Sequence, residues 1–178
     1  AQQEDGQYAS SYIPNHGTSS GVSRVSEVAK LRDMNLGTSY TVLFDFDATD
    51  NFRVNTVLFT MWENQDDTAF NDALWTARWF KTDSNQNDSF KVYDQRGLAY
   101  PVTSAYTSST KKWVMRVDGT SFDLFQNEGG TPTKRSGNPL SGTRSVERFE
   151  ISAQKSLINN LVFFDSALTD AECQSLIT

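Results

Sequence analysis

The chain has 178 residues, of which 37% are hydrophobic and 12% aromatic, so its length and core fit one all-β domain. A net charge of −6 without any basic run excludes a nucleic-acid backbone as partner, because displacing its counterions needs clustered lysines and arginines. One cysteine, Cys173, excludes an intrachain disulfide and is expected to be a buried apolar residue. No signal peptide or membrane-spanning run is recognisable, so we expect folding in the cytosol and no membrane insertion.

Residues 1–29 differ from the rest, because they are rich in Ser, Gly, Gln and Asn and lack a long apolar period. We predict an extended arm or linker here, followed by a β-sandwich domain over residues 30–178. Pro14 excludes a helix in the arm. The candidate docking side chains of the arm are Tyr8, Tyr12, Ile13 and Val25.

From Tyr40 onward, alternating runs at intervals of roughly a dozen residues predict antiparallel strands. The predicted strands are Tyr40–Asp47, Val54–Met61, Ala73–Phe80, Ser89–Asp94, Arg144–Ser152 and Leu157–Asp165. A turn at Lys81–Asp88 and loops at Gln95–Thr110 and Glu128–Gly142 are expected between strands. Thr169 and Glu172 form a capping box, which predicts a short C-terminal helix from about Asp170.

The stretch Lys112–Gly130 is predicted to be a hairpin whose two turn residues are Asp118 and Gly119. This turn sets Val117 opposite Thr120, Met115 opposite Phe122 and Trp113 opposite Leu124. One face is then apolar and belongs to the core: Trp113, Met115, Val117, Phe122 and Leu124. The other face is polar, with Arg116 and Asp123 diagonal across the strands beside Ser121.

Many short antiparallel strands followed by one terminal helix indicate an all-β sandwich of jelly-roll type. Trp113–Gly130 resembles the "W…V.vdGt…l..NG" hairpin of laminin-G-like and concanavalin A-like lectin folds. Leu157–Leu176 resembles the closing strand and helix of the same folds. These two resemblances together imply a concanavalin A-like or laminin-G-like jelly roll with a short C-terminal helix.

A second resemblance lies in the arm, which is similar to a junction "AQLE.G.yATSYIPT.g..vtRaaDva" of bacteriophage tail-fibre and other virion proteins. The matching residues are Ala1, Gln2, Glu4, Gly6, Tyr8, Ala9, Ser11, Tyr12, Ile13, Pro14, Arg24 and Val28. Gln3, Asn15 and Glu27 depart from the pattern. The resemblance implies that residues 1–4 end an upstream domain, and that the sandwich is a module for recognising host-surface glycans.

Catalytic patterns known for jelly rolls are not matched. Glucanases of this fold carry Glu-x-Asp-x-x-Glu on one strand, whereas Asp45 and Asp47 lack the third carboxylate. Glu147 and Glu150 are three apart and therefore on opposite faces. Lyases of this fold need Gln-x-His, but the one histidine, His16, lies in the arm and is expected on the surface. We therefore do not expect an enzyme.

A sugar site is favoured between Trp62 and Trp79, because sugars stack on aromatic rings while amides and carboxylates bind their hydroxyls. The candidate ligand-binding residues are Trp62, Glu63, Asn64, Asp66, Asp67, Trp75 and Trp79. The alternative for Trp75 and Trp79 is the core, and Trp62 at a strand end is the better surface candidate.

Calcium is a candidate cofactor, since folds of this type often hold one at loop tips through six to eight oxygens. The candidate ligands are Asp45, Asp47 and Asp50 with Asn51, or alternatively Asp66 and Asp67. No spacing among them is diagnostic.

The sequence thus leads to three functional hypotheses. The first is a non-catalytic carbohydrate-recognition module of a phage tail fibre or other virion protein, which acts outside the cell on a host-surface polysaccharide. The second is a structural or assembly module that decorates the virion or forms a homotrimer, and the third is a polysaccharide-degrading enzyme. The upstream domain of the same protein is an expected partner in each.

Overall fold

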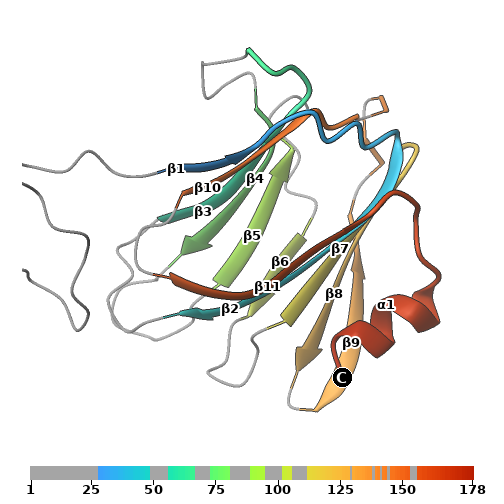
Figure 1. The fold of residues 1–178 in the computed structure, drawn as a ribbon. Coiled ribbons are helices and arrows are strands. Elements are labelled where there is room, and N and C mark those ends of the chain that lie inside the picture. Colours follow the sequence, from blue (N-terminus) through green and yellow to red (C-terminus); the bar gives the residue numbers. More distant parts are fainter. Residues whose placement is uncertain are drawn as a thin grey trace, which may run out of the picture.

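The computed structural model describes residues 28–48, 56–66, 73–80, 89–94, 102–105, 112–128, 130–137, 139–140, 142–143, 145–152 and 156–178. These residues form two antiparallel sheets and one helix (Figure 1). The predicted arm lies outside the described residues up to position 27, and with it Tyr8, Tyr12, Ile13, His16 and Val25.

One sheet has six strands in the order β1-β10-β3-β4-β5-β6. Its strands are β1 Val28–Leu31, β10 Arg148–Ser152, β3 Thr56–Trp62, β4 Ala73–Phe80, β5 Ser89–Asp94 and β6 Val102–Ala105. The other sheet has five strands in the order β11-β2-β7-β8-β9. Its strands are β11 Ser156–Phe164, β2 Ser39–Ala48, β7 Lys112–Asp118, β8 Ser121–Glu128 and β9 Thr131–Ser136. The predicted antiparallel β-sandwich is confirmed.

The core lies between the inner faces of the two sheets and is rich in aromatic rings. Trp75 of β4 is fully buried, and its ring stacks on Phe122 of β8 with centroids 4.8 Å apart. The indole Nε1–H of Trp75 donates a 2.7 Å hydrogen bond to Tyr40 Oη, so the one polar group of this buried ring is satisfied across the sandwich. These contacts join the two sheets.

The β7–β8 hairpin has the predicted faces but a different register. Val117 lies opposite Phe122 and Asp118 opposite Ser121, so Gly119 and Thr120 are the turn residues. Gly119 has φ 59°, as the first central residue of a type II′ turn requires. The predicted pairing was wrong by two residues, which preserves both faces because side chains alternate with a period of two. Consequently Arg116 and Asp123 lie directly opposite, not diagonal.

Three strands occupy segments that were assigned to loops or to the arm. β6 lies within the predicted loop Gln95–Thr110, β9 lies within Glu128–Gly142, and β1 begins at Val28, before the expected start of the domain. β1, β6 and β9 are edge strands of four to six residues. Short edge strands are often polar and carry no clear apolar alternation, which explains why the sequence pattern missed them.

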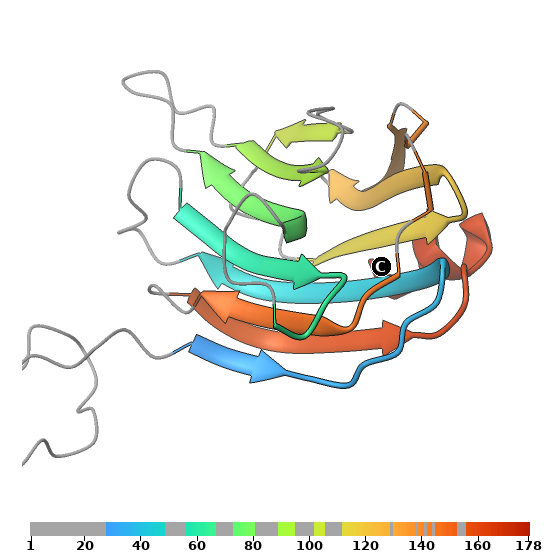
Figure 2. The same cartoon turned by 90° about the horizontal axis from the view of Figure 1, so that it is seen from above.

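The C-terminal helix α1, Asp170–Leu176, packs on the outer face of the five-stranded sheet (Figures 1 and 2). Cys173 and Ile177 contact a small apolar cluster there, formed with Val114 and Phe125. The capping box is confirmed, since the Thr169 hydroxyl accepts from the Glu172 amide and the Glu172 carboxylate accepts from the Thr169 amide. The expected burial of Cys173 is also confirmed.

Candidate functional site

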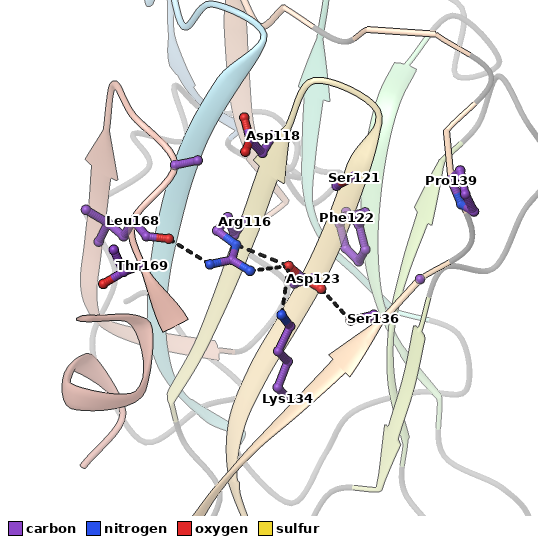
Figure 3. Close-up of a pocket in the computed structure, with 12 residues that line it drawn as sticks. Arg116, Asp118, Ser121, Phe122, Asp123, Lys134, Ser136, Pro139, Leu168 and Thr169 are labelled. Atoms are coloured by element: carbon purple, nitrogen blue, oxygen red, sulfur yellow. Dashed lines mark hydrogen bonds and ion pairs between the residues drawn. The ribbon is translucent and has the colours of Figure 1, made fainter. Parts of the chain in front are cut away.

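A cleft of about 560 Å³ opens on the outer face of the five-stranded sheet, beside the start of α1 (Figure 3). Most of its lining side chains are charged or carry hydroxyl groups. The lining residues are Arg116, Asp118, Ser121, Phe122, Asp123, Lys134, Ser136, Gly137, Pro139, Ala167, Leu168 and Thr169.

Strand alternation places the polar lining residues on one face. Arg116 of β7 lies opposite Asp123 of β8, which in turn lies opposite Ser136 of β9. Asp118 and Ser121 continue the same face toward the hairpin turn, because each is two residues from a member of the first pair. The cleft floor is therefore a row of polar side chains from three adjacent strands.

Asp123 is the centre of a charged network on this floor (Figure 3). Its carboxylate accepts hydrogen bonds from Arg116 Nε at 3.1 Å, from Arg116 Nη2 and from Ser136 Oγ at 2.6 Å. Lys134 Nζ lies 3.6 Å from the same carboxylate. Only 7% of Asp123 is exposed, so these donors compensate for the loss of water around its charge.

The network also fixes the start of α1 to the sheet. Arg116 Nη1 donates to the Leu168 carbonyl at 2.8 Å and pairs with Asp170 Oδ1 at 2.7 Å. Lys134 Nζ binds Asp170 Oδ2 at 3.0 Å. Hydrogen bonds from Lys134 and Arg116 hold the pKa of Asp170 below its ordinary value. Burial opposes the charge of Arg116, but its bonds to Asp123 and Asp170 outweigh burial and raise its pKa.

Asp118 differs from the other carboxylates of the cleft. It is exposed, and the hydrogen bond that its side chain makes within the described residues is from Ser39 Oγ, at 2.8 Å. In the described part of the chain, no lysine or arginine nitrogen lies within 4.0 Å of its oxygens. Asp118 therefore retains acceptor sites that a ligand can use, next to the exposed Ser121.

Two of the predicted aromatic ligand residues, Trp62 and Trp75, lie outside the cleft and are buried. Trp62 is 4% exposed, with the guanidinium of Arg148 4.4 Å from its ring centroid. Arg148 also donates a hydrogen bond to the Gln65 carbonyl in the turn after β3. Trp75 is a core residue, as its alternative interpretation predicted. The surface position expected for Trp62 is therefore wrong, and a role of either ring in ligand binding stays a prediction.

The polar residues after Trp62 form a turn at the end of β3. Asn64 and Asp66 are exposed and Glu63 is half-buried. Gln65 Nε2 bonds Asp33 Oδ1 at 3.2 Å and the Glu147 carbonyl at 2.9 Å. None of these turn residues lines the cleft, so the turn and the cleft are separate candidate sites. Asp67 and the side chain of Trp79 lie outside the described residues, and a ligand role for the turn stays a prediction.

The candidate calcium ligands are described only in part. Asp45 is 8% exposed and accepts from Asn159 Nδ2 at 3.3 Å and Asn160 Nδ2 at 3.4 Å. The side chain of Asp47 and all of Asp50 lie outside the described residues. Within the described ranges, no three His, Cys, Asp or Glu side chains are grouped so as to hold a metal. Calcium at Asp45 stays a prediction.

Sequence reasoning found part of the cleft without identifying it as a site. The polar hairpin face with Arg116, Ser121 and Asp123 was predicted, and this face is the floor. Lys134 and Pro139 were missed because they lie in a segment assigned to a loop.

No helix in the described part of the chain has the length and apolar character that crossing a membrane requires.

Comparison with known proteins identifies the fold. No protein-family model matches the sequence, and no curated protein matches it. A sialidase from Trypanosoma rangeli, solved in complex with sialic acid, is similar with a TM-score of 0.55 and 14% identity. The match covers 87% of this chain and 28% of that one, so the chain spans little more than a quarter of the sialidase.

A second similar structure is domain 4 of AbnA, an extracellular GH43 arabinanase from Geobacillus stearothermophilus, in complex with arabinotriose. Its TM-score is 0.51 at 17% identity, with 83% of this chain and 70% of that chain covered. A tetrameric galectin from the ball sponge Cinachyrella is matched at a TM-score of 0.48 and 8% identity, over 78% of this chain and 99% of that chain. The chain shares its β-sandwich fold with the matched part of the sialidase and with domain 4 of AbnA.

Proposed function

We propose that this domain is a non-catalytic glycan-recognition module whose ligand binds in the cleft beside α1. The observation that carries the proposal is the chemistry of the cleft floor, where carboxylates, cations and hydroxyls from three strands face one open space of about 560 Å³. Sugar hydroxyls both donate and accept hydrogen bonds, so a mixed polar surface of this kind suits them.

The comparison with the arabinanase domain supports this proposal. That domain shares the sandwich fold and was solved with a bound trisaccharide, arabinotriose. Because a shared fold does not establish a shared function, the argument for this chain rests on its own cleft. The cleft is large enough for a short oligosaccharide, since binding sites for small ligands start at about 300 Å³.

The non-catalytic part of the proposal is supported by the partners of the carboxylates in the cleft. Hydrolysis of a glycosidic bond uses two carboxyl groups, one of which must give and take a proton. Asp123 is surrounded by donors from Arg116, Ser136 and Lys134, which occupy its oxygens. Asp118 is then the remaining carboxylate that lines the cleft, and it lacks the second carboxyl group that hydrolysis needs.

The virion part of the proposal is supported by the resemblance of residues 1–28 to the tail-fibre junction. In this proposal the domain belongs to a phage tail fibre or other virion surface protein, acts outside the cell and recognises a host polysaccharide. The upstream domain and a homotrimeric fibre are its proposed partners, and assembly without sugar binding is the alternative.

A glycan array probed with the 178-residue chain, followed by calorimetry on the hits, tests the proposal. We expect binding to at least one class of bacterial surface glycan, inhibition of phage adsorption by the free chain, and no release of reducing ends or unsaturated sugars. A chain that binds no glycan but forms a stable trimer in light scattering would favour the assembly alternative. Release of sugar products would instead establish an enzyme.

A further inference from the structure

The two cations of the cleft have little capacity left for a ligand. Arg116 uses Nε and Nη2 on Asp123 and Nη1 on the Leu168 carbonyl and on Asp170. Its side chain is 13% exposed. A guanidinium that recognises an anionic ligand needs two parallel donors directed at it, and here those donors point at protein carboxylates.

The ammonium group of Lys134 is also occupied by carboxylates of the protein. Its ammonium lies 3.0 Å from one oxygen of Asp170 and 3.3 Å from the other, and 3.6 Å from Asp123. The two cations and these two carboxylates therefore neutralise one another. A ligand anion would have to compete with carboxylates that the fold already holds in place.

Asp118 adds a negative charge that no described cation compensates. It lines the cleft at the hairpin turn and is exposed, with one hydrogen bond from Ser39. The charged groups in and beside the cleft comprise two cations and three carboxylates, which gives a net charge of one negative unit. The cations are Arg116 and Lys134, and the carboxylates are Asp118, Asp123 and Asp170. The chain as a whole carries −6, which further disfavours anions near the cleft.

We infer that the cleft selects uncharged saccharides and rejects acidic ones, with Asp118 as the side chain that binds sugar hydroxyls. The inference rests on the proposed function of the cleft and specifies its ligand class. Two adjacent hydroxyls of a neutral sugar can donate to the two oxygens of one carboxylate, whereas a uronic or sialic acid would bring its own carboxylate toward Asp118.

Matched neutral and acidic oligosaccharides test the inference. Galactotriose and trigalacturonate differ by oxidation at one carbon of each residue. They would be measured by calorimetry beside arabinotriose and sialyllactose, together with the neutral and acidic members of the array. We expect binding among the neutral sugars alone, with an affinity that does not change between low and high salt, because a neutral ligand forms no ion pair for salt to screen.

The variant Asp118→Asn supplies the second measurement. Loss of a charged acceptor should weaken the binding of neutral sugars about tenfold, the order expected for charge-assisted hydrogen bonds. It should also reduce the discrimination against trigalacturonate. Asp33→Asn makes the same charge change outside the cleft and should leave both affinities unchanged, with circular dichroism confirming that each variant is folded.

Three kinds of result would overturn the inference or part of it, and they can be told apart. Acidic sugars binding as tightly as neutral ones, or affinity falling steeply with salt, would refute the selection and leave the glycan-binding proposal in place. Absence of binding to every neutral and acidic sugar would refute both. Neutral binding that is unaffected by Asp118→Asn would remove Asp118 from the site.

Discussion

Asp123 shows how one residue serves both the fold and the cleft. It is 7% exposed and neutralised by Arg116, and Ser136 and Lys134 contribute further contacts. Removing one partner of a buried ion pair is costly, because the remaining charge is left without compensation. The same network fixes the start of α1, so the cost should extend to the helix.

We therefore expect Asp123→Ala to lower the free energy of unfolding by about 3 kcal/mol. Arg116 would keep its ion pair with the half-exposed Asp170 but lose its ion pair with Asp123, which is the more buried of the two carboxylates. Urea denaturation followed by fluorescence measures this change. Asp66→Ala removes an exposed carboxylate after β3 and should change stability by less than about 0.5 kcal/mol. Equal effects of the two substitutions would contradict the role of the network.

Cys173 is the second residue with a measurable consequence. Burial raises the pKa of its thiol to about 11, so on the order of one thiol in a thousand is thiolate near pH 8. Iodoacetamide should accordingly react with the folded chain far more slowly than with the chain in urea. Mass spectrometry of the alkylated protein follows this reaction, and rapid labelling of the folded chain would show that α1 is not docked as described.

Among the elements, the β7–β8 hairpin shows what an alternating pattern can and cannot predict. The faces followed from the sequence, because apolar residues at every second position must share one side of a strand. The register did not follow, because shifting the pairing by two residues keeps the same faces and differs only in the turn. Asp-Gly suggested one turn, whereas the structure uses Gly119 and Thr120.

Gly119→Ala should destabilise the domain by about 1 kcal/mol, because a Cβ at φ 59° is strained even though no atom lies within 4 Å of its position. Gly37→Ala is the matched control, since its position is equally open but its φ is not positive. We expect this control to be neutral or slightly stabilising. Thermal unfolding compares the two, and equal losses would argue against the observed turn.

The helix α1 is held to the sheet by charges that depend on pH. Hydrogen bonds lower the pKa of Asp170, so its stabilising contribution is present above the ordinary carboxyl pKa of about 4 and is lost as pH falls through the lowered value. Because half of its side chain is exposed, the contribution is small. Asp170→Asn should reduce the loss of stability in acid, measured by urea titrations from neutral pH to about pH 2.

At the scale of the molecule, the sequence predicted the sandwich and most of its strands but not the location of the cleft. Strands such as Ala73–Phe80 and Ser89–Asp94 were predicted with the observed bounds, because they combine aromatic residues with clear turn signals. The cleft combines the β7–β8 hairpin with Lys134 of β9 and with Leu168 before α1. Such long-range contacts leave no local pattern in the chain.

The predicted sugar site illustrates the same limit. Trp62 at a strand end was expected on the surface, but Arg148, more than eighty residues later, stacks on its ring. No feature of the sequence near Trp62 predicts the contact with Arg148. The polar row of Arg116, Ser121 and Asp123, in contrast, was visible in the alternation of the hairpin, and it is this row that the fold exposes in a cleft.

The central claim is that the cleft beside α1 binds a glycan. Its most direct test is an NMR titration of the isotopically labelled chain with the best neutral saccharide from the array. The account predicts that amide shifts concentrate on Ser121, Ser136 and Thr169, and that Asp118→Asn needs about ten times more sugar to reach the same shifts. Shifts centred on the Glu63–Asp66 turn, with the cleft unchanged, would contradict it.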